Sequence, residues 1–396
     1  MNSLIAKSIK ENLSYEGFKL KLKELPFDFL VKESKVYPEL FLIFSSKEKV
    51  SSDDKKVNSE NELLQRQANG IILEKDGFKV VCRSFDNYIE NIGWESEYYN
   101  GESKKKIEVY EEGTFLRLFF FKDKWIVSTL KCINVEETFL FGKKKNFNDL
   151  FWEAGKKIDV DNLDRTFSYS FILKHPENRC GIDYKGIPTL VYCGKFDLNN
   201  WEPCIEKVFS KDLKKETSLE NLKIENSAGE TDIVDITELE YSQEVIDSQI
   251  DREDLLSKGI IVVLDTGDRI SFMNKKFLEV AEIRGSNPCI NMRYIELNPE
   301  DRLKLIEYFP EFDLENIDKK LEEKALNILK IYLCCYVYKK YDKEGIKYGL
   351  DKIVARLDAY YKETKSKITV EFCQKKLLEC SSKELCMIMG WKKNVK

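Results

Sequence analysis

Three apolar stretches of this chain reverse direction around a short polar turn, and they constrain its fold more than any other feature of the sequence. The paired runs and their turns are Ile71–Leu73 with Phe78–Cys82 around Asp76-Gly77, Phe115–Phe121 with Trp125–Val127 around Lys122-Asp123-Lys124, and Ile260–Leu264 with Arg269–Phe272 around Asp265-Thr266-Gly267-Asp268. Two β-prone runs joined by such a turn are typical of a β-hairpin. The sequence therefore predicts an antiparallel-sheet core, built mainly from short strands between about Phe18 and Arg293.

The period of the apolar residues changes after Pro299. In KKLEEKALNILKIYLCCYVYKKY they recur at helical spacing, at Leu321, Ala325, Ile328, Leu329, Tyr332, Leu333 and Tyr336. Two further helical runs are predicted, from Leu350 to Tyr361 and from Val370 to Met387. We therefore expect an α+β protein, with an antiparallel-sheet domain over residues 1–298 and a C-terminal helical domain over residues 299–396 whose apolar stripes form its core.

Two charged stretches, at residues 45–61 and 210–254, interrupt the strand pattern. Both are poor in aromatic residues and weakly periodic, and such a composition buries too little apolar surface to order a chain. We predict surface loops or partly disordered insertions at both places.

The charges of the chain nearly cancel. With 65 basic and 70 acidic residues the net charge is −5, so no global basic field indicates nucleic acid, and any nucleic-acid binding has to be local. No apolar run approaches the roughly 18 residues that a membrane span needs, and the opening MNSLIAKSIKENLSYEGF lacks the layout of a signal peptide. We expect a cytoplasmic protein without a membrane partner.

Cysteine and histidine do not indicate a metal site. The eleven cysteines contain no CxxC pair, and His175 is the only histidine of the chain, so the expectation is free thiols in a reducing compartment. His175 begins a polar turn, HPENR, and no cysteine or serine with the context of a nucleophile stands beside it. We interpret His175 as a turn residue rather than as a general base.

Several short blocks occur in an order that resembles the nucleotidyltransferase domain of phage-type RNA ligases, part of the covalent nucleotidyltransferase superfamily. The form is similar to that of ligase-like proteins of large DNA viruses. The blocks are Tyr37–Leu42, Asn69–Leu73 with Lys79–Phe85, Tyr110–Thr114 with Trp125–Thr129, Tyr169–Tyr184, and Lys258–Phe277. The resemblance extends over roughly Tyr37 to Leu297 and implies an ATP-grasp-like adenylation fold.

The resemblance also implies a chemistry. In that family a lysine attacks the α-phosphate of ATP, acidic groups hold a divalent metal such as Mg²⁺, and a lysine of the last hairpin neutralises the phosphate. ATP and Mg²⁺ are the cofactors that any remaining activity would need.

This chain departs from the family at the positions that carry the chemistry. The nucleophile's position falls on Tyr110, a phenol that would have to lose a proton near pKa ~10 before it could attack. Two carboxylate positions fall on Ser170 and Lys258, and a lysine repels a metal. The second lysine of the last hairpin falls on Ser271. No catalytic residue is therefore expected.

Other family positions are retained. Arg83, Glu112, Gly113 and Arg269 are candidates for residual nucleotide or phosphate binding; for Glu112 and Arg269 the alternative is a strand-end charge in solvent. The remaining retained residues are typical of turns, strands and packing: Thr114, Trp125, Ser128, Thr129, Pro176, Asn178, Arg179, Gly259, Arg284, Gly285, Pro288, Arg293 and Tyr294.

Three hypotheses follow. The first is a pseudoenzyme, an RNA-ligase-like protein that binds RNA, a nucleotide or a protein partner without catalysis. The second is an active ATP-dependent RNA ligase in which one of Lys104–Lys106 replaces the nucleophile, although the run GESKKK is interpreted as an exposed loop. The third is a structural component of virion assembly, located in a viral factory or virion.

Overall fold

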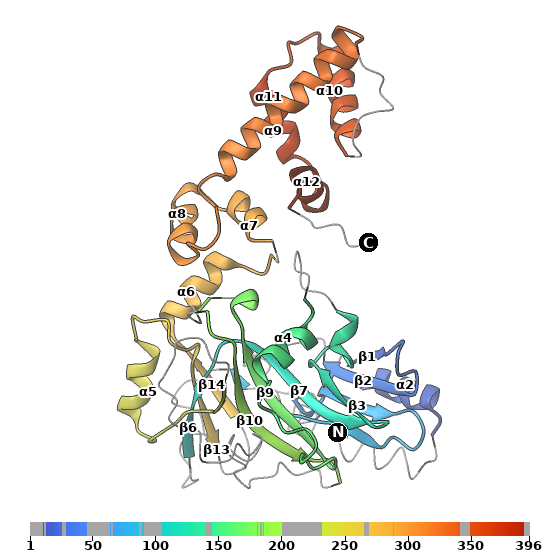
Figure 1. The fold of residues 1–396 in the computed structure, drawn as a ribbon, viewed down its shortest axis with the longest axis vertical. Coiled ribbons are helices and arrows are strands. Elements are labelled where there is room, and N and C mark those ends of the chain that lie inside the picture. Colours follow the sequence, from blue (N-terminus) through green and yellow to red (C-terminus); the bar gives the residue numbers. More distant parts are fainter. Residues whose placement is uncertain are drawn as a thin grey trace. The chain divides into compact units, whose positions relative to one another are not determined.

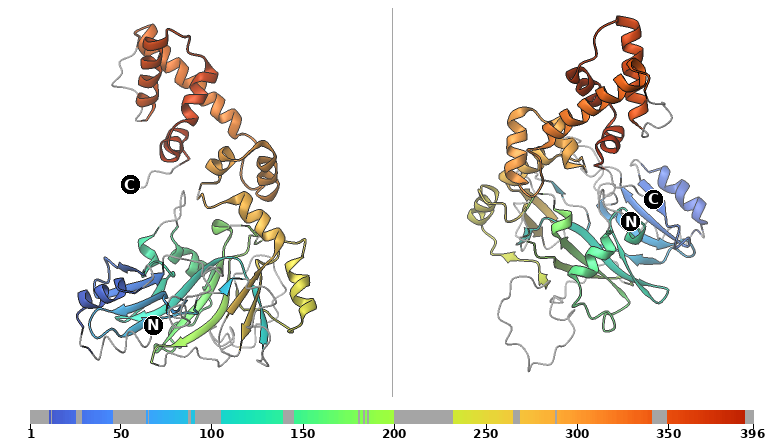
Figure 2. Two further views of the ribbon diagram at one scale, coloured as in Figure 1. Left: turned by 180° about the vertical axis from the view of Figure 1, so that it is seen from behind. Right: turned by 45° about the horizontal axis from the view of Figure 1, so that its top comes forward.

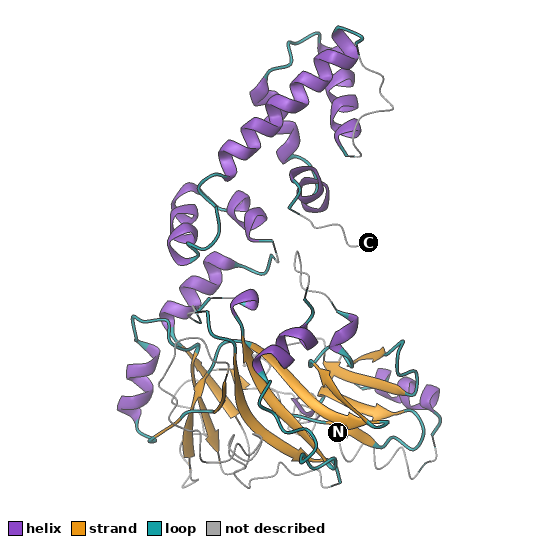
Figure 3. Cartoon of the chain, viewed as in Figure 1, coloured by secondary structure: helices purple, strands orange, loops and turns teal. Residues whose placement is uncertain are grey.

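The computed structural model describes residues 11, 13–25, 29–45, 64, 66–86, 89–90, 105–138, 145–179, 181–182, 184, 186–199, 232–264, 269–287, 289–340 and 349–391. The chain forms two compact units, one that ends at Glu279 and one that runs from Val280 to Lys396. All strands among the described residues precede Lys275, and the elements that follow are helices (Figure 3). The α+β class is thereby confirmed. None of the helices in these ranges is long and apolar enough to cross a membrane.

The first sheet is antiparallel, with the strand order β1, β2, β3, β4, which are Phe29–Glu33, Leu40–Ser45, Asn69–Glu74 and Val80–Cys82. Helix α2, Tyr15–Lys23, lies along one face (Figure 1), where Phe18 and Leu22 are buried among side chains of β2 and β3. The other face packs against Phe119 and Ile126 of the second sheet. Strand β2 is buried on both faces because it lies between a helix and another sheet.

The second sheet has the strand order β11, β10, β9, β7, β8, which are Asp232–Asp235, Thr189–Asp197, Phe167–Lys174, Thr114–Phe121 and Lys124–Ser128. Only β10 and β11 are parallel within this sheet as described. One face packs its apolar side chains against Leu150 and Phe151 of α4, Phe147–Ala154. Because successive side chains alternate, Arg117 and Ser170 lie on the opposite face, and both are also buried.

The third sheet has the strand order β12, β6, β13, β14, β5, which are Glu238–Leu239, Lys105–Tyr110, Gly259–Leu264, Arg269–Met273 and Ile89–Glu90. Its apolar face is covered by α5, Gln243–Ile250, the yellow helix of Figure 2, through Ile246. The alternate residues of β6 and β14 are polar and lie on the opposite face: Lys106, Glu108, Tyr110, Arg269 and Ser271.

All three predicted hairpins are confirmed, in β3–β4, β7–β8 and β13–β14. The β7–β8 turn is a two-residue turn in which Lys122 and Asp123 have φ of 45° and 60°, and positive φ at both positions matches the twist of a hairpin. Phe78, predicted as a strand residue, belongs instead to the turn before β4, with φ of 53°. The turn at residues 265–268 lies outside the described residues.

The second unit contains the end of α6, Lys275–Arg284, and the helices that follow it, namely α7 Ile290–Glu296, α8 Pro299–Tyr308, α9 Ile317–Tyr332, α10 Leu350–Thr364, α11 Val370–Leu378 and α12 Ser382–Met389. The predicted stripe on α9 is confirmed, since Leu321, Ala325, Ile328 and Tyr332 are buried. A π-helical segment, Leu333–Val337, follows it.

The predicted single helix from Val370 to Met387 is wrong. The helix α11 ends at Leu378, and α12 begins after a capping box at Ser381. In this box the Ser381 side chain accepts from the amide of Glu384, and the Glu384 carboxylate accepts from the amide of Ser381. The capping signal in the sequence therefore outweighs the continuous apolar period.

The stretch predicted as mainly strands contains β1 to β14, and it also holds the helices α2, α4, α5, α6 and α7, of which α4 begins at a capping box of Asn146 and Asp149. One further prediction is wrong. The segment predicted as a charged loop contains β11, β12 and α5 within residues 232–250, because Ile233 and Ile246 supply the apolar contacts that the composition obscured. Residues 210–231 and 46–61 lie outside the described residues, and the boundary at residue 298 remains a prediction.

Candidate functional site

A pocket of about 260 Å³ opens in the first unit at the ends of several strands. Its lining combines aromatic rings with a few charged and polar groups: Phe44, Ser45, Asn69, Phe85, Asp86, Tyr110, Glu111, Gly113, Phe115, Leu130, Lys131, Ile172 and Lys258. Ligand pockets are typically roughly 300–1,000 Å³, apolar, with few polar groups that orient the ligand. At about 260 Å³ this pocket lies just below that range, and its lining has both the aromatic rings and the few polar groups of such a site.

Tyr110 and Lys258 meet in this pocket. Tyr110 ends β6 opposite Gly259, and the amide of Lys258 donates to the Tyr110 carbonyl at 2.8 Å. The Lys258 carbonyl accepts from the amide of Asn274 at 2.8 Å, so the backbone of Lys258 is held on both sides. Its Nζ lies 5.0 Å from the centre of the Tyr110 ring, within the range of a cation–π contact. The positions that the resemblance assigns to a nucleophile and to a metal ligand thus hold a phenol and a cation side by side.

Gly113 also lines the pocket, and its backbone excludes a side chain. It has φ of 148°, and a Cβ there would lie 2.5 Å from the carbonyl oxygen of Leu173 and 2.6 Å from Ile172 Cγ2. This glycine lets the chain approach β9 closely before β7 begins.

The two carboxylates of the lining already have cationic neighbours. Glu111 forms an ion pair with Lys174 at 2.8 Å. Asp86 lies 3.5 Å from an Nη of Arg83, while burial raises the pKa of Asp86. Both acids are therefore partly neutralised by the protein itself.

Glu112 does not line the pocket. It is almost fully buried, and its Oε2 accepts from the amide of Ile182 at 2.6 Å and from the Tyr184 hydroxyl at 3.0 Å. Burial raises the pKa of Glu112, which the amide of Ile182, Tyr184 and the nearby Lys258 oppose. Its carboxylate holds the segment after β9 and is not a solvated strand-end charge.

Arg269 is buried as well. It donates to Glu108 on β6 at 2.6 Å, and its guanidinium lies 4.3 Å from the centre of the Phe85 ring. Phe85 lines the pocket and Arg269 does not, so Arg269 contacts the Phe85 ring without being part of the lining itself. The interpretation of Arg269 and Glu112 as solvated charges is therefore wrong, because both are held by specific partners.

Ser170 and Ser271 are also buried, and neither is part of the lining. Ser170 lies in the middle of β9, between Arg117 on β7 and Gly194 on β10, and its hydroxyl has no hydrogen-bond partner among the described residues. A carboxylate at position 170 would be surrounded by protein.

Arg83 is fixed mainly through its backbone. Its amide donates to the Ser168 hydroxyl at 3.2 Å, and that hydroxyl donates to the Arg83 carbonyl at 2.6 Å.

Sequence reasoning missed a second arginine, Arg117, which is fully buried and donates to the carbonyls of Gly70 and Thr129. The only signal in the sequence is that Arg117 stands within an otherwise apolar strand, TFLRLFFF, and shares one of its faces with Phe115 and Phe119. Arg117 links the first sheet to the second.

The donors in this region do not fit Mg²⁺. That ion prefers carboxylate and other oxygen ligands in octahedral geometry. Of the three positions that the resemblance assigns to carboxylates, Glu112 is buried outside the lining with its Oε2 bonded to Ile182 and Tyr184, Ser170 is buried outside the lining, and Lys258 is a cation. Nor does the described part of the chain contain a group of three acidic, histidine or cysteine side chains arranged to hold a metal.

The lysines proposed as substitutes lie elsewhere. Lys105 and Lys106 are in β6, not in an exposed loop, because they pair with Leu264 and Val263 of β13. They are at the opposite end of that strand from Tyr110, and Lys106 forms ion pairs with Glu108 at 2.7 Å and Glu238 at 3.1 Å. Lys104 lies outside the described residues.

His175 is a turn residue, as predicted. It is 2% exposed, and it caps the short helix Pro176–Asn178, because its Nδ1 accepts from the amide of Glu177. Burial lowers the pKa of His175, although the carboxylates of Glu153 and Glu177 oppose this. It is not part of the pocket lining.

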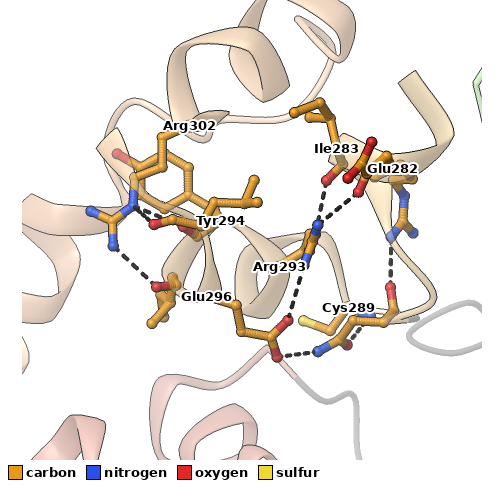
Figure 4. A network of polar contacts seen from close by, with 11 residues as sticks. Glu282, Ile283, Cys289, Arg293, Tyr294, Glu296 and Arg302 are labelled. Carbon is orange, nitrogen blue, oxygen red and sulfur yellow. Dashed lines mark hydrogen bonds and ion pairs between the residues drawn. The ribbon is translucent and has the colours of Figure 1, made fainter. Parts of the chain in front are cut away.

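Several retained residues near the end of the resemblance form a structural network in the second unit (Figure 4). Arg293 donates to the carbonyls of Ile283 at 2.8 Å and Glu282 at 2.7 Å, which lie in the last turn of α6. Arg302 donates to three carbonyls at the end of α7, those of Tyr294, Ile295 and Leu297. Each arginine satisfies carbonyls that a helix leaves unpaired at its C-terminal end.

No protein-family model matches this chain, and no curated protein sequence matches it. Among solved structures it is similar to one described as "Putative ATP-dependent DNA ligase from Aquifex aeolicus", with 15% identity and a TM-score of 0.42. The match covers 74% of this chain and 70% of that chain.

Proposed function

We propose that this chain is a non-catalytic, RNA-ligase-like protein that binds a nucleotide in the pocket around Tyr110. The observation that carries the proposal is the pairing of Tyr110 with Lys258 in an aromatic pocket. An aromatic lining accepts the flat face of a base, and an ammonium group attracts phosphate. The pocket therefore has the two kinds of contact that a nucleotide needs.

The same pairing argues against catalysis. Tyr110 offers a phenol in place of an amine, and a phenol is a weak nucleophile while it is protonated. Lys258, in the position of a metal ligand, would repel the ion that polarises the phosphate. The nucleotide is therefore expected to bind reversibly and to leave unchanged.

The test combines two measurements on the full chain. Equilibrium binding of ATP and GTP is measured by titration calorimetry, and intact mass is recorded after incubation with each nucleotide and Mg²⁺. We expect saturable binding and an unchanged mass. A mass increase of one nucleotide would overturn the non-catalytic assignment and support a relocated lysine, which peptide mapping would then identify.

A matched pair of variants shows whether binding occurs in this pocket. Phe115→Ala removes one aromatic wall and is expected to weaken binding, whereas Phe312→Ala removes an exposed phenyl ring in the second unit and is expected to leave binding unchanged. Equal affinities for wild type and both variants would place the nucleotide elsewhere.

A further inference from the structure

We propose that the second unit binds a single-stranded polynucleotide on a surface rich in tyrosine and lysine. This tyrosine–lysine surface consists of residues 336–340, at the end of the π-helical segment, and residues 361–367, at the end of α10. None of these residues lines the pocket around Tyr110, so the inference does not depend on the proposed function.

Two tyrosine rings of this surface lie largely in solvent. Tyr338 is 59% exposed and Tyr361 is 42% exposed, whereas Tyr332, which directly precedes the π-helical segment, is buried. The apolar stripe of α9 therefore ends in the core of the unit, and the two exposed rings do not serve that core. An exposed aromatic ring offers a flat face on which a nucleobase can stack.

The two segments are neighbours in space. Burial raises the pKa of Tyr332, and the nearby Asp358 and Tyr361 of α10 add to this rise. Tyr336 stacks on Tyr332, with 5.8 Å between the ring centres and 17° between the ring planes. The ion pair with Asp358 raises the pKa of Lys362, and Tyr336 lies close enough to contribute. The end of the π-helical segment and the end of α10 thus belong to the same part of the unit.

Each exposed ring has a lysine beside it. The Nζ of Lys340 lies 5.8 Å from the centre of the Tyr338 ring, and the Nζ of Lys365 lies 5.7 Å from the centre of the Tyr361 ring. Both lysines are exposed, and neither forms an ion pair with a described residue. A phosphate can therefore approach each cation while a base stacks on the adjacent ring.

The local charge is positive although the chain as a whole is not. The two segments contain five lysines and one acidic residue, Glu363, while the net charge of the chain is −5. Asp358, which precedes the second segment, is paired with Lys362 at 2.7 Å. A local excess of cations attracts a phosphate backbone and releases the counterions that surround it.

The backbone of the first segment is held in a defined turn. The amide of Tyr338 donates to the carbonyl of Leu333 at 2.8 Å, and the amide of Lys340 donates to that of Cys334 at 2.9 Å. Lys339, between them, has φ of 54°. Because this backbone is ordered before a ligand arrives, less conformational entropy is lost on binding.

The combination of rings and cations favours a single strand over a duplex. Lysines alone attract any polyanion, whereas stacking on a tyrosine requires a base whose face is open. In a duplex the bases are stacked on one another and paired, so a duplex would be held by the lysines only.

The experiment measures binding of labelled oligonucleotides of about 12 nucleotides to the full chain by fluorescence anisotropy. The probes are a single-stranded RNA, a single-stranded DNA of the same sequence, and the duplex of each. We expect a single strand to bind more tightly than its duplex, with the log of the affinity falling linearly with the log of the salt concentration. Binding of either single strand supports the proposal, and the ratio of the two affinities identifies the preferred sugar.

Two pairs of substitutions test the rings and the cations separately. Tyr338→Ala with Tyr361→Ala should weaken single-strand binding about ten- to a hundredfold, while Tyr338→Phe with Tyr361→Phe keeps the rings and should retain most of the affinity. Lys340→Gln with Lys365→Gln should lower the slope of the salt dependence by roughly 1.4, since two phosphate contacts are lost.

A matched control removes two lysines elsewhere. Lys35→Gln with Lys319→Gln changes the net charge by the same amount at exposed positions outside the surface, and should bind as wild type does. Thermal unfolding of each variant shows that it is folded.

Three results would overturn the inference. They are no binding of either single strand at low salt, a duplex bound as tightly as its single strands, and an affinity that the two Tyr→Ala substitutions leave unchanged. None of these results bears on nucleotide binding in the pocket, which the titration with ATP and GTP tests separately.

Discussion

At the residue scale, the pocket is defined by which functional groups stand at a few strand ends. Tyr110 supplies an aromatic face and a hydroxyl, and Lys258 supplies a charge. A protonated phenol does not attack phosphate readily, and an ammonium does not hold a metal. Both departures from the resemblance support the proposal that the site binds a nucleotide without transferring it.

Restoring the lysine alone should not restore the chemistry. Tyr110→Lys would place a second ammonium beside Lys258, and the repulsion would not be offset by the carboxylates and the ion that the reaction needs. We expect no nucleotide adduct by intact mass after incubation with ATP and Mg²⁺, with Tyr110→Phe as the control that keeps the ring. An adduct on Tyr110→Lys would mean that the rest of the pocket remains competent.

The single histidine makes a direct test of burial possible. Because burial lowers the pKa of His175, its imidazole proton resonance should titrate below the ordinary value of about 6.5. Between the lowered pKa of the folded state and the value of about 6.5 in the unfolded state, the unfolded chain binds more protons than the folded chain. The stability that is fully present above about pH 6.5 is therefore lost as the pH falls through the folded pKa.

His175→Asn removes this titration while keeping a side-chain acceptor for the amide of Glu177. Below about pH 6.5 the unfolding free energy of wild type should therefore fall relative to that of the variant, as measured by urea denaturation across the pH range. A difference that does not change with pH would contradict the assignment of a buried, neutral imidazole.

At the element scale, the ends of α6 and α7 depend on arginines that come later in the chain. Arg293 satisfies carbonyls at the end of α6, and Arg302 does so for α7 (Figure 4). Gly285 lies against Arg293, since a Cβ at Gly285 would be 2.8 Å from the Arg293 Nε. Gly285 and Arg293 thus have a structural role at the end of α6.

Arg293→Met should destabilise the protein. It removes two charged hydrogen bonds to carbonyls at the end of α6, and we expect a loss of about 2 kcal/mol in the free energy of unfolding. Chemical denaturation followed by circular dichroism measures the loss. Lys319→Met, an exposed position on α9 with the same change in charge, should cost less than about 0.5 kcal/mol. Equal losses would show that the contacts of Arg293 contribute little.

At the scale of the whole molecule, the helical unit starts earlier than the change in sequence period suggests. The compact division falls between Glu279 and Val280, within α6. The helices on either side of Pro299 are joined by contacts, as when the Tyr294 hydroxyl donates to Asp318 on α9 at 2.9 Å. Ile290 and Met292 of α7 are buried as well.

Two fragments distinguish the compact division from the boundary predicted at residue 298. A fragment of residues 280–396 keeps α7, whereas one of residues 299–396 loses its buried side chains and the partners of Arg302. We expect the longer fragment to be more stable by roughly 3 kcal/mol or more in thermal or chemical unfolding. Equal stability would favour the boundary at residue 298.

Prediction from the sequence succeeded where the signal was local. The β7–β8 hairpin, the stripe of Leu321 and Ala325 on α9, and the turn at His175 each depend on a few neighbouring residues. It failed for α5 and for the break after Leu378, because the composition or apolar period of a long window was followed there in place of the local caps at Ser242 and Ser381.

The sequence by itself determined the α+β class and the three hairpins, and its resemblance to a ligase family drew attention to Tyr110, Ser170 and Lys258. Only the tertiary structure decided which of these positions share a pocket. Tyr110 and Lys258 meet because β6 and β13 pair there, while Glu112 and Arg269 turn inward to Tyr184 and Glu108. The physical reason is that strand pairing and burial are long-range: they bring distant residues together and require every buried charge to find a partner.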